Sequence, residues 1–271
     1  MIQKLKNDKK ILIAILMFVF FSLWWGLVQL PVSNQHLLNQ LWGGLYGIEA
    51  LVGAIWGLRI YRDWGGSKSL MGKAIMLFAL GLFAQEFGQL SYNYYIFYRQ
   101  IEIPYPSLGD IGFFSSIPFY LFGALYLAKA SGVKVSLQSF KSKIQAAIIP
   151  LALLSYSYFI FLHGYEFDWS KPLTIFLDFG YPLGQALYVS VALLAVLLVR
   201  GVLGGIMKYR VFFIFFALLF QYLCDFMFLY QANNKTWVAG GINDFMYLVS
   251  YLIMTLALLQ LRMSIIKSKL S

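Results

Sequence analysis

Eight long apolar stretches constrain the fold of this 271-residue chain more than any other feature. Each is close to the ~20 residues that an α-helix needs to cross ~30 Å of hydrocarbon. They are continuously apolar, whereas a membrane β-strand alternates apolar with polar residues. The sequence therefore predicts an all-α, polytopic integral membrane bundle of eight transmembrane helices. The predicted spans are 11–30, 41–61, 71–95, 110–130, 144–163, 173–199, 210–231 and 241–261.

The composition agrees with a chain that lies almost wholly within the bilayer. Hydrophobic residues make up 61% of the chain and charged residues 12%, against ~25% charged residues in soluble proteins. The longest connection, residues 96–109, is too short to bury a core of its own. We therefore expect a single transmembrane domain over residues 1–271, with function confined to the helices and their short loops.

The distribution of positive charge predicts the orientation. Eighteen of the 21 Lys and Arg residues lie in the two chain ends and in the connections 59–73, 129–143 and 200–210. Because cytoplasmic loops carry the excess of Lys and Arg, both termini are predicted to lie in the cytoplasm, in a multi-pass protein of the cell membrane. Topology and attraction to anionic lipid also account for the net charge of +10. No nucleic-acid partner is expected.

Carboxylates occur within the apolar stretches or at their outer ends, always in the half far from the lysine-rich loops. An ionised acid in hydrocarbon costs at least ~2.5 kcal/mol, so such residues normally face a protein interior or a wet cavity. A shared acidic level predicts one cavity that opens to the outer side. The six acids are Glu49, Glu86, Asp110, Asp178, Asp225 and Asp244.

Three of the predicted helices open with an acid that is followed three residues later by an aromatic residue. Three-residue spacing places both side chains on one helical face. The pattern predicts a repeated helical hairpin, in which Glu86/Asp110 and Asp225/Asp244 are matching pairs. Capping of a helix by aspartate is the alternative explanation for Asp110 and Asp244. The three openings are Asp110-Ile-Gly-Phe113, Asp178-Phe-Gly-Tyr181 and Asp244-Phe-Met-Tyr247.

An acidic, aromatic-lined pocket is suited to a cation: a metal ion with oxygen ligands, a proton, or an organic amine held by cation–π contacts. Amides at membrane depth either join helices or line such a cavity, and Gln85, Gln185 and Gln221 are of this kind. Asp178, Asp225 and Glu86 are predicted to form the core of the site, and the identity of any metal stays open. The candidate ligand- or ion-binding residues are Glu49, Glu86, Gln89, Asn93, Asp110, Asp178, Tyr181, Asp225, Asp244 and Tyr247.

The sequence offers little for catalysis. The two histidines, His36 and His163, lie in or beside outer loops, so an intramembrane zinc hydrolase or a haem held by two histidines is not expected. A hydrolase with two aspartates stays open in principle, with Asp178 and Asp225 as the nearest candidates. Their local sequences differ from those of such families, and we expect neither an enzyme nor a cofactor.

The stretch Ile103-Pro104-Tyr105-Pro106-Ser107-Leu108-Gly109-Asp110-Ile111-Gly112-Phe113 resembles a helix entry in polytopic sensor regions. These regions lie at the N-termini of bacterial diguanylate cyclases with GGDEF and EAL domains, and of some histidine kinases. Residues 177–184 and the Asp244-x-x-Tyr247 opening are similar to other helix openings there. The resemblance, over about residues 80–262, implies a signal-receiving bundle in a bacterial inner membrane. Without an output domain after Arg262, it implies a separate cytoplasmic or membrane signalling partner.

Three functions follow from these patterns. The leading hypothesis is a receptor-like or sensor-like module that binds a cation, a proton or a small amphipathic ligand in an outward-facing pocket. A secondary transporter or ion channel would use the same carboxylates, and a structural subunit would pair them with another chain. The inner parts of the spans are nearly all apolar, which favours a blind pocket over a pore; examples are 75–82, 189–199, 211–219 and 252–259.

Overall fold

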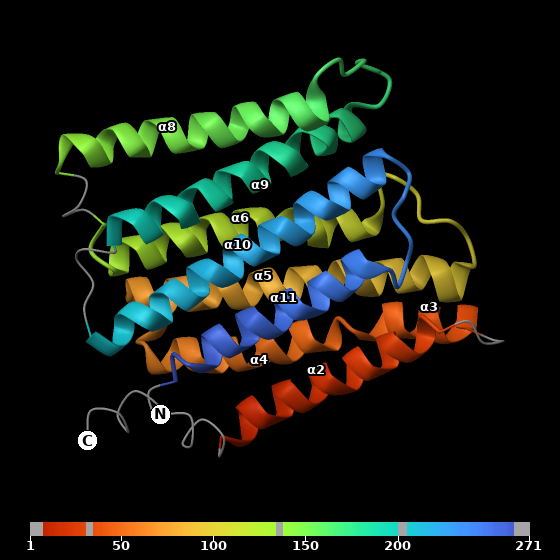
Figure 1. Ribbon diagram of the computed structural model, residues 1–271, viewed down its shortest axis with the longest axis horizontal. Helices are drawn as coiled ribbons and strands as arrows, with labels where there is room; N and C mark the ends of the chain where they lie inside the picture. The colour runs from red at the N-terminus through yellow and green to blue at the C-terminus, as the bar shows by residue number, and fades with distance from the viewer. Residues whose placement is uncertain (1–7, 31–34, 134–137, 200–204, 263–271) are drawn as a thin grey trace.

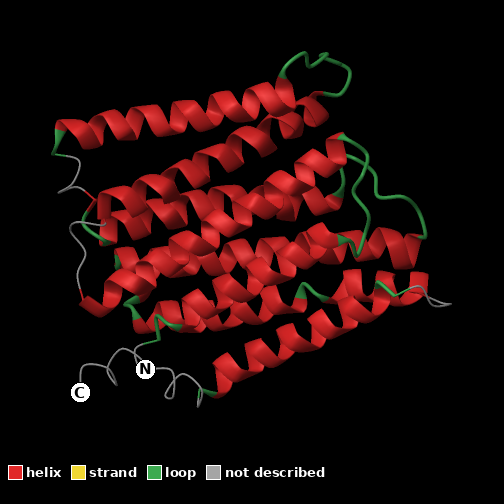
Figure 2. Ribbon diagram, viewed as in Figure 1, coloured by secondary structure: helices red, strands yellow, loops and turns green. Residues whose placement is uncertain are grey.

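The computed structural model describes residues 8–30, 35–133, 138–199 and 205–262, and these residues form helices and connections without any strand (Figures 1 and 2). Within them, eight helical segments are long and apolar enough to cross a membrane. The prediction of an all-α bundle with eight spans is therefore confirmed. Several of the basic segments used to predict the orientation, at both chain ends and near residues 134–137 and 200–204, lie outside the described residues.

Most spans consist of one helix, but three are assembled from two pieces. The helices α3 and α4 together form the second span, while the π-helical turns η2 (Tyr94–Arg99) and η3 (Tyr158–Leu162) continue α5 and α8. A short 3-10 turn, η1 (Gly66–Lys68), precedes α5. The α-helices are α2 (Lys9–Val28), α3 (Gln35–Leu45), α4 (Ile48–Asp63), α5 (Leu70–Asn93), α6 (Leu108–Ala130), α8 (Phe140–Ser157), α9 (Pro172–Val199), α10 (Gly205–Asn233) and α11 (Ile242–Leu259).

The second span differs from its prediction as one helix over 41–61. It runs from Leu37 to Asp63 and breaks at Tyr46 and Gly47, between α3 and α4. A Cβ atom at Gly47 would overlap the Oε2 atom of Glu86 on α5. The missing side chain at Gly47 therefore lets the broken turn approach α5 closely, which hydropathy alone does not reveal.

Consecutive spans run antiparallel, and the chain ends described here lie at one end of the bundle, called the proximal end (Figure 1). The opposite, distal end carries the connections 100–107, 163–171 and 234–241. Helices α5 and α6 form the most extensive pair, α4 packs on α5 and α11, and α9 packs on α6. Helix α8 lies at the edge on α9 and is the least buried span. This arrangement leaves the distal ends of α5, α6, α9, α10 and α11 facing a common interior.

The proximal half of the bundle is a packed apolar core. Phe78, Ile214, Leu218 and Leu258 are fully buried there. In lipid, helices associate through close packing rather than through exclusion of water, so such contacts hold the bundle together. At the proximal surface, the Arg262 guanidinium forms an ion pair with Asp8 at 2.8 Å, which joins the two ends of the described chain.

Candidate functional site

A cavity of about 510 Å³ lies in the distal half of the bundle. Helices α5, α6, α9, α10 and α11 form its walls, and the connections before α6 and α9 contribute to its distal rim. Most of the lining is apolar or aromatic, including Phe113, Ile117, Leu177 and Phe228. Exposed lining residues such as Asn233 connect the cavity with the distal surface.

Four carboxylates line this cavity, and they have no basic counterpart there. The described lining residues include no lysine, arginine or histidine. Each acid instead accepts hydrogen bonds from neutral donors, which stabilise the charged form of a carboxylate but do not neutralise it. The cavity therefore combines acidic side chains with apolar walls. Its acids are Asp110, Asp178, Asp225 and Asp244.

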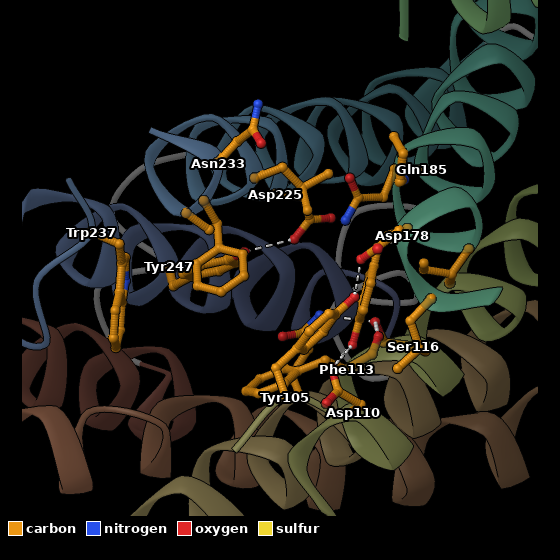
Figure 3. A pocket seen from close by; sticks show the side chains of 18 of the residues that line it. Tyr105, Asp110, Phe113, Ser116, Asp178, Gln185, Asp225, Asn233, Trp237 and Tyr247 are labelled. Carbon is orange, nitrogen blue, oxygen red and sulfur yellow. Dashed lines mark hydrogen bonds between the residues drawn. The ribbon is translucent and has the colours of Figure 1, made fainter. Parts of the chain in front are cut away.

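Asp225 on α10 is the most completely surrounded of these acids. Its carboxylate accepts hydrogen bonds from the hydroxyl of Tyr188 (2.6 Å), the amide of Gln221 (2.9 Å) and the hydroxyl of Tyr247 (3.0 Å). Ser250 in turn donates to Gln221 Oε1 at 2.7 Å. Figure 3 shows the hydrogen bond between Tyr247 and Asp225 at the cavity wall. Three helices thus fix the position of this one carboxylate.

Asp110 and Asp244 lie where α6 and α11 begin. Asp110 accepts a bond from the backbone N–H of Ser107 at 2.7 Å within a capping box, and another from the Tyr181 hydroxyl at 2.7 Å. Asp244 accepts a bond from the backbone N–H of Gly240 at 2.7 Å. The capping explanation therefore describes Asp110, whereas Asp244 bonds to the residue before the N-cap Gly241. Both acids also line the cavity, so their bonds at the helix starts do not exclude contact with a molecule bound there.

Asp178 joins two distal connections. The hydroxyls of Tyr105 and Tyr165 each donate to one of its carboxylate oxygens at 2.6 Å. Burial, together with the hydrogen bond to Asp178, raises the pKa of Tyr105 well above its usual value. The hydrogen bond to Asp178 is the main cause that raises the pKa of Tyr165 to about 12. Both tyrosines therefore remain protonated donors at neutral pH and hold their loops beside the cavity.

Gln185 lines the cavity, and no group in the described part of the chain forms a hydrogen bond with its side-chain amide. It is 5% exposed and lines the cavity from α9. In Figure 3 its amide points away from α9, toward the carboxylate of Asp225. A buried amide without a partner costs free energy, whereas one that meets a ligand does not. The amide is therefore open to the cavity, where water or a bound molecule can form hydrogen bonds with it.

Seven of the ten predicted site residues line the cavity: Gln89, Asp110, Asp178, Tyr181, Asp225, Asp244 and Tyr247. Asn93 instead donates to the backbone carbonyl of Gly44 at 2.7 Å and lines a smaller cavity of about 210 Å³. Glu49 and Glu86 line neither cavity. The structure thus brings most of the predicted residues together.

Glu86 was expected at the core of the site, yet it turns toward Gly47 on the α3–α4 break. Its neighbour Gln85 faces the cavity instead, because successive residues point about 100° apart around a helix. Glu49 is fully buried, and neither carboxylate oxygen has a hydrogen-bond partner in the described chain. Both acids belong to helix packing rather than to the cavity.

Tyr165 and Tyr188 were missed as site residues. Tyr188 had a detectable signal, since Asp178, Tyr181, Gln185 and Tyr188 follow the three- and four-residue spacing of one helical face. Tyr165 lies in a connection, where no periodicity applies. Only the folded chain shows that it reaches Asp178.

The cavity is not arranged as a metal site. The described residues contain no group of three or more His, Cys, Asp or Glu side chains close enough to hold a metal ion. The chain matches no protein-family model, no curated protein and no solved structure.

Proposed function

We propose that this protein is a membrane receptor module that binds a small organic cation in the distal cavity. The observation that carries the proposal is a cavity with four carboxylates, apolar walls and no basic residue among its described lining. Burial disfavours an unpaired charge, while the donors around each acid favour the ionised form. A bound cation resolves this conflict, because it supplies the missing positive charge.

Aromatic rings in the cavity wall provide a second kind of contact for an amine. Phe113, Tyr247 and Tyr251 present aromatic rings at the lining, and aromatic faces attract ammonium groups, most strongly where water is excluded. With the basic ends in the cytoplasm by the positive-inside rule, the cavity faces outward. The ligand then reaches the site from outside the cell.

The position of the cavity residues along their helices favours a receptor over a transporter or channel. The cavity residues belong to the distal halves of their helices, apart from Tyr251 near the middle of α11. Below them lies the packed apolar core around Phe78, Ile214 and Leu218. A structural subunit that offers its acids to another chain is less favoured, because these acids point into the chain's own cavity. The resemblance to bacterial sensor regions supports the same choice, with a separate partner to receive the signal.

The test is thermal stability of the purified chain in detergent, with primary amines, monovalent cations and divalent cations added in turn. A ligand that binds only the native state stabilises it by ~2.7 kcal/mol at 100 times its dissociation constant. We expect amines to raise the melting temperature of the wild type, and to raise it much less in Asp225→Asn and Asp178→Asn. Glu49→Gln is the matched control, and its response should equal that of the wild type. Equal shifts in all four proteins, or none in the wild type, would overturn the proposal.

A further inference from the structure

Three of the four carboxylates of the cavity, Asp178, Asp110 and Asp225, lie on one face of α9 or bond to it. Tyr181 holds Asp110, and Tyr188 holds Asp225. The two tyrosines are seven residues apart, which is two helical turns and about 10 Å along the axis. Asp178 lies one turn on the distal side of Tyr181. The cavity therefore has a distal anionic end, at Asp178 and Asp110, and a deep anionic end at Asp225.

Gln185 lies between the two ends. It follows Tyr181 by four residues and precedes Tyr188 by three, so it shares their face of α9. The residue is 5% exposed, and its amide points into the cavity, where no described group forms a hydrogen bond with it (Figure 3). A single primary ammonium at either end would leave this amide and the other end without a partner.

Much of the remaining lining suits an aliphatic chain, since Ile117, Leu177, Pro182 and Phe228 are apolar. Of the other polar lining groups, Gln85 bonds to Ser116 and Asp244 accepts a bond from the Gly240 backbone. A ligand that matches all these features is linear, with a cation at each end, an apolar chain and one polar nitrogen between them. Metal ions and compact amines match only one end.

We propose that the cavity binds a linear polyamine, with one terminal ammonium at Asp225, the other at Asp178 and Asp110, and an internal secondary ammonium that donates to Gln185 Oε1. This inference rests on the proposed function, since it names the class of cation that the site takes. It goes further by assigning a separate partner to each nitrogen. Affinity then depends on the length of the ligand and on its internal nitrogen.

The experiment is calorimetric titration of the full chain in detergent with three sets of ligands. They are linear α,ω-diamines of increasing length, monoamines of matched length, and linear triamines with a central secondary amine. In the wild type, the best diamine should bind about 30-fold tighter than its matched monoamine, the lower range for pairing a buried charge. Affinity should pass through a maximum with chain length. A triamine of similar length should bind more tightly still.

Variants then separate the positions. Asp225→Asn and Asp178→Asn should each bring diamine affinity close to that of the monoamine. Gln185→Leu should weaken triamine binding and leave diamine binding unchanged, while Glu49→Gln should change neither. Wild-type diamines and monoamines that bind equally at every length would overturn the polyamine inference and leave cation binding intact. Absence of binding by every amine would overturn the proposed function itself. The wild-type length series decides the matter even if a variant fails to fold.

Discussion

Asp225 and Glu49 are both acids buried inside membrane spans, but they differ in their hydrogen-bond partners. Asp225 is 5% exposed and accepts three hydrogen bonds at the cavity wall. Glu49 is 0% exposed, and no described group bonds to its carboxylate. A buried charge without donors is far more costly than one with several, so Glu49 is expected to be neutral. Partners, rather than depth or residue type, distinguish a site acid from a packed one.

The largest expected effect concerns the donors around Asp225. Asp225→Leu leaves the hydroxyls of Tyr188 and Tyr247 and the amide of Gln221 without their acceptor. Each unsatisfied buried group costs ~1–3 kcal/mol, so a loss of ~3 kcal/mol or more in stability is expected. Thermal unfolding in detergent without ligand measures it. A variant as stable as the wild type would show that these hydrogen bonds contribute nothing to the fold.

A substitution at Gly47 tests the packing of the buried acid Glu86. Gly47→Ala forces a methyl group into the carboxylate of Glu86, the end of a flexible side chain that must shift, so we expect a loss near the lower end of the ~1–3 kcal/mol that overpacking costs. Shortening the neighbour in Gly47→Ala/Glu86→Ala should recover much of that loss, because residues in contact are energetically coupled. Melting temperatures of the two single variants and the double variant measure this. Strictly additive effects would contradict the contact.

Glu49→Leu provides the counterpart to Asp225→Leu. It removes a buried carboxyl that has no described partner, and apolar replacement of poorly compensated polar groups is often neutral or stabilising. We expect stability within ~1 kcal/mol of the wild type, or above it, with amine binding unchanged. The same melting and binding assays apply. Loss of amine binding would place Glu49 in the site after all.

The smallest expected effect is a change in the titration of Tyr165 at the distal rim. The pKa of Tyr165 is raised to about 12 from a usual value of 10.0, chiefly by its bond to Asp178. A raised folded-state pKa means that this bond contributes stability below about pH 10 and is lost as pH rises through about 12. Asp178→Asn should move the titration back toward its usual range. The difference in tyrosinate absorbance between each protein and its Tyr165→Phe partner measures it, and identical titrations would exclude the bond.

The bundle was predictable from sequence because hydropathy and helix length are local properties. Eight apolar stretches of near-spanning length fix eight helices, and acids among them indicate a polar interior. The cavity's acids Asp178 and Asp225 could be named for this reason. The break at Gly47 could not, since it depends on where Glu86 of another helix points.

The sequence did not reveal which acid each tyrosine bonds to. The Asp-x-x-Tyr openings place acid and tyrosine on one helix, yet each tyrosine bonds to an acid elsewhere: Tyr181 to Asp110, and Tyr247 to Asp225. Likewise, nothing local distinguishes Glu49 from Asp225. These differences arise from how the helices pack, and only the folded chain shows them.

Amine binding in the distal cavity can be observed in a structure determined with an iodinated primary amine, whose iodine marks the ligand by anomalous scattering. We expect one strong signal inside the distal cavity, with the ammonium beside Asp225 or Asp178, and no signal there for Asp225→Asn/Asp178→Asn. A signal confined to the lipid-facing surface, or an unchanged cavity signal in that double variant, would contradict this expectation.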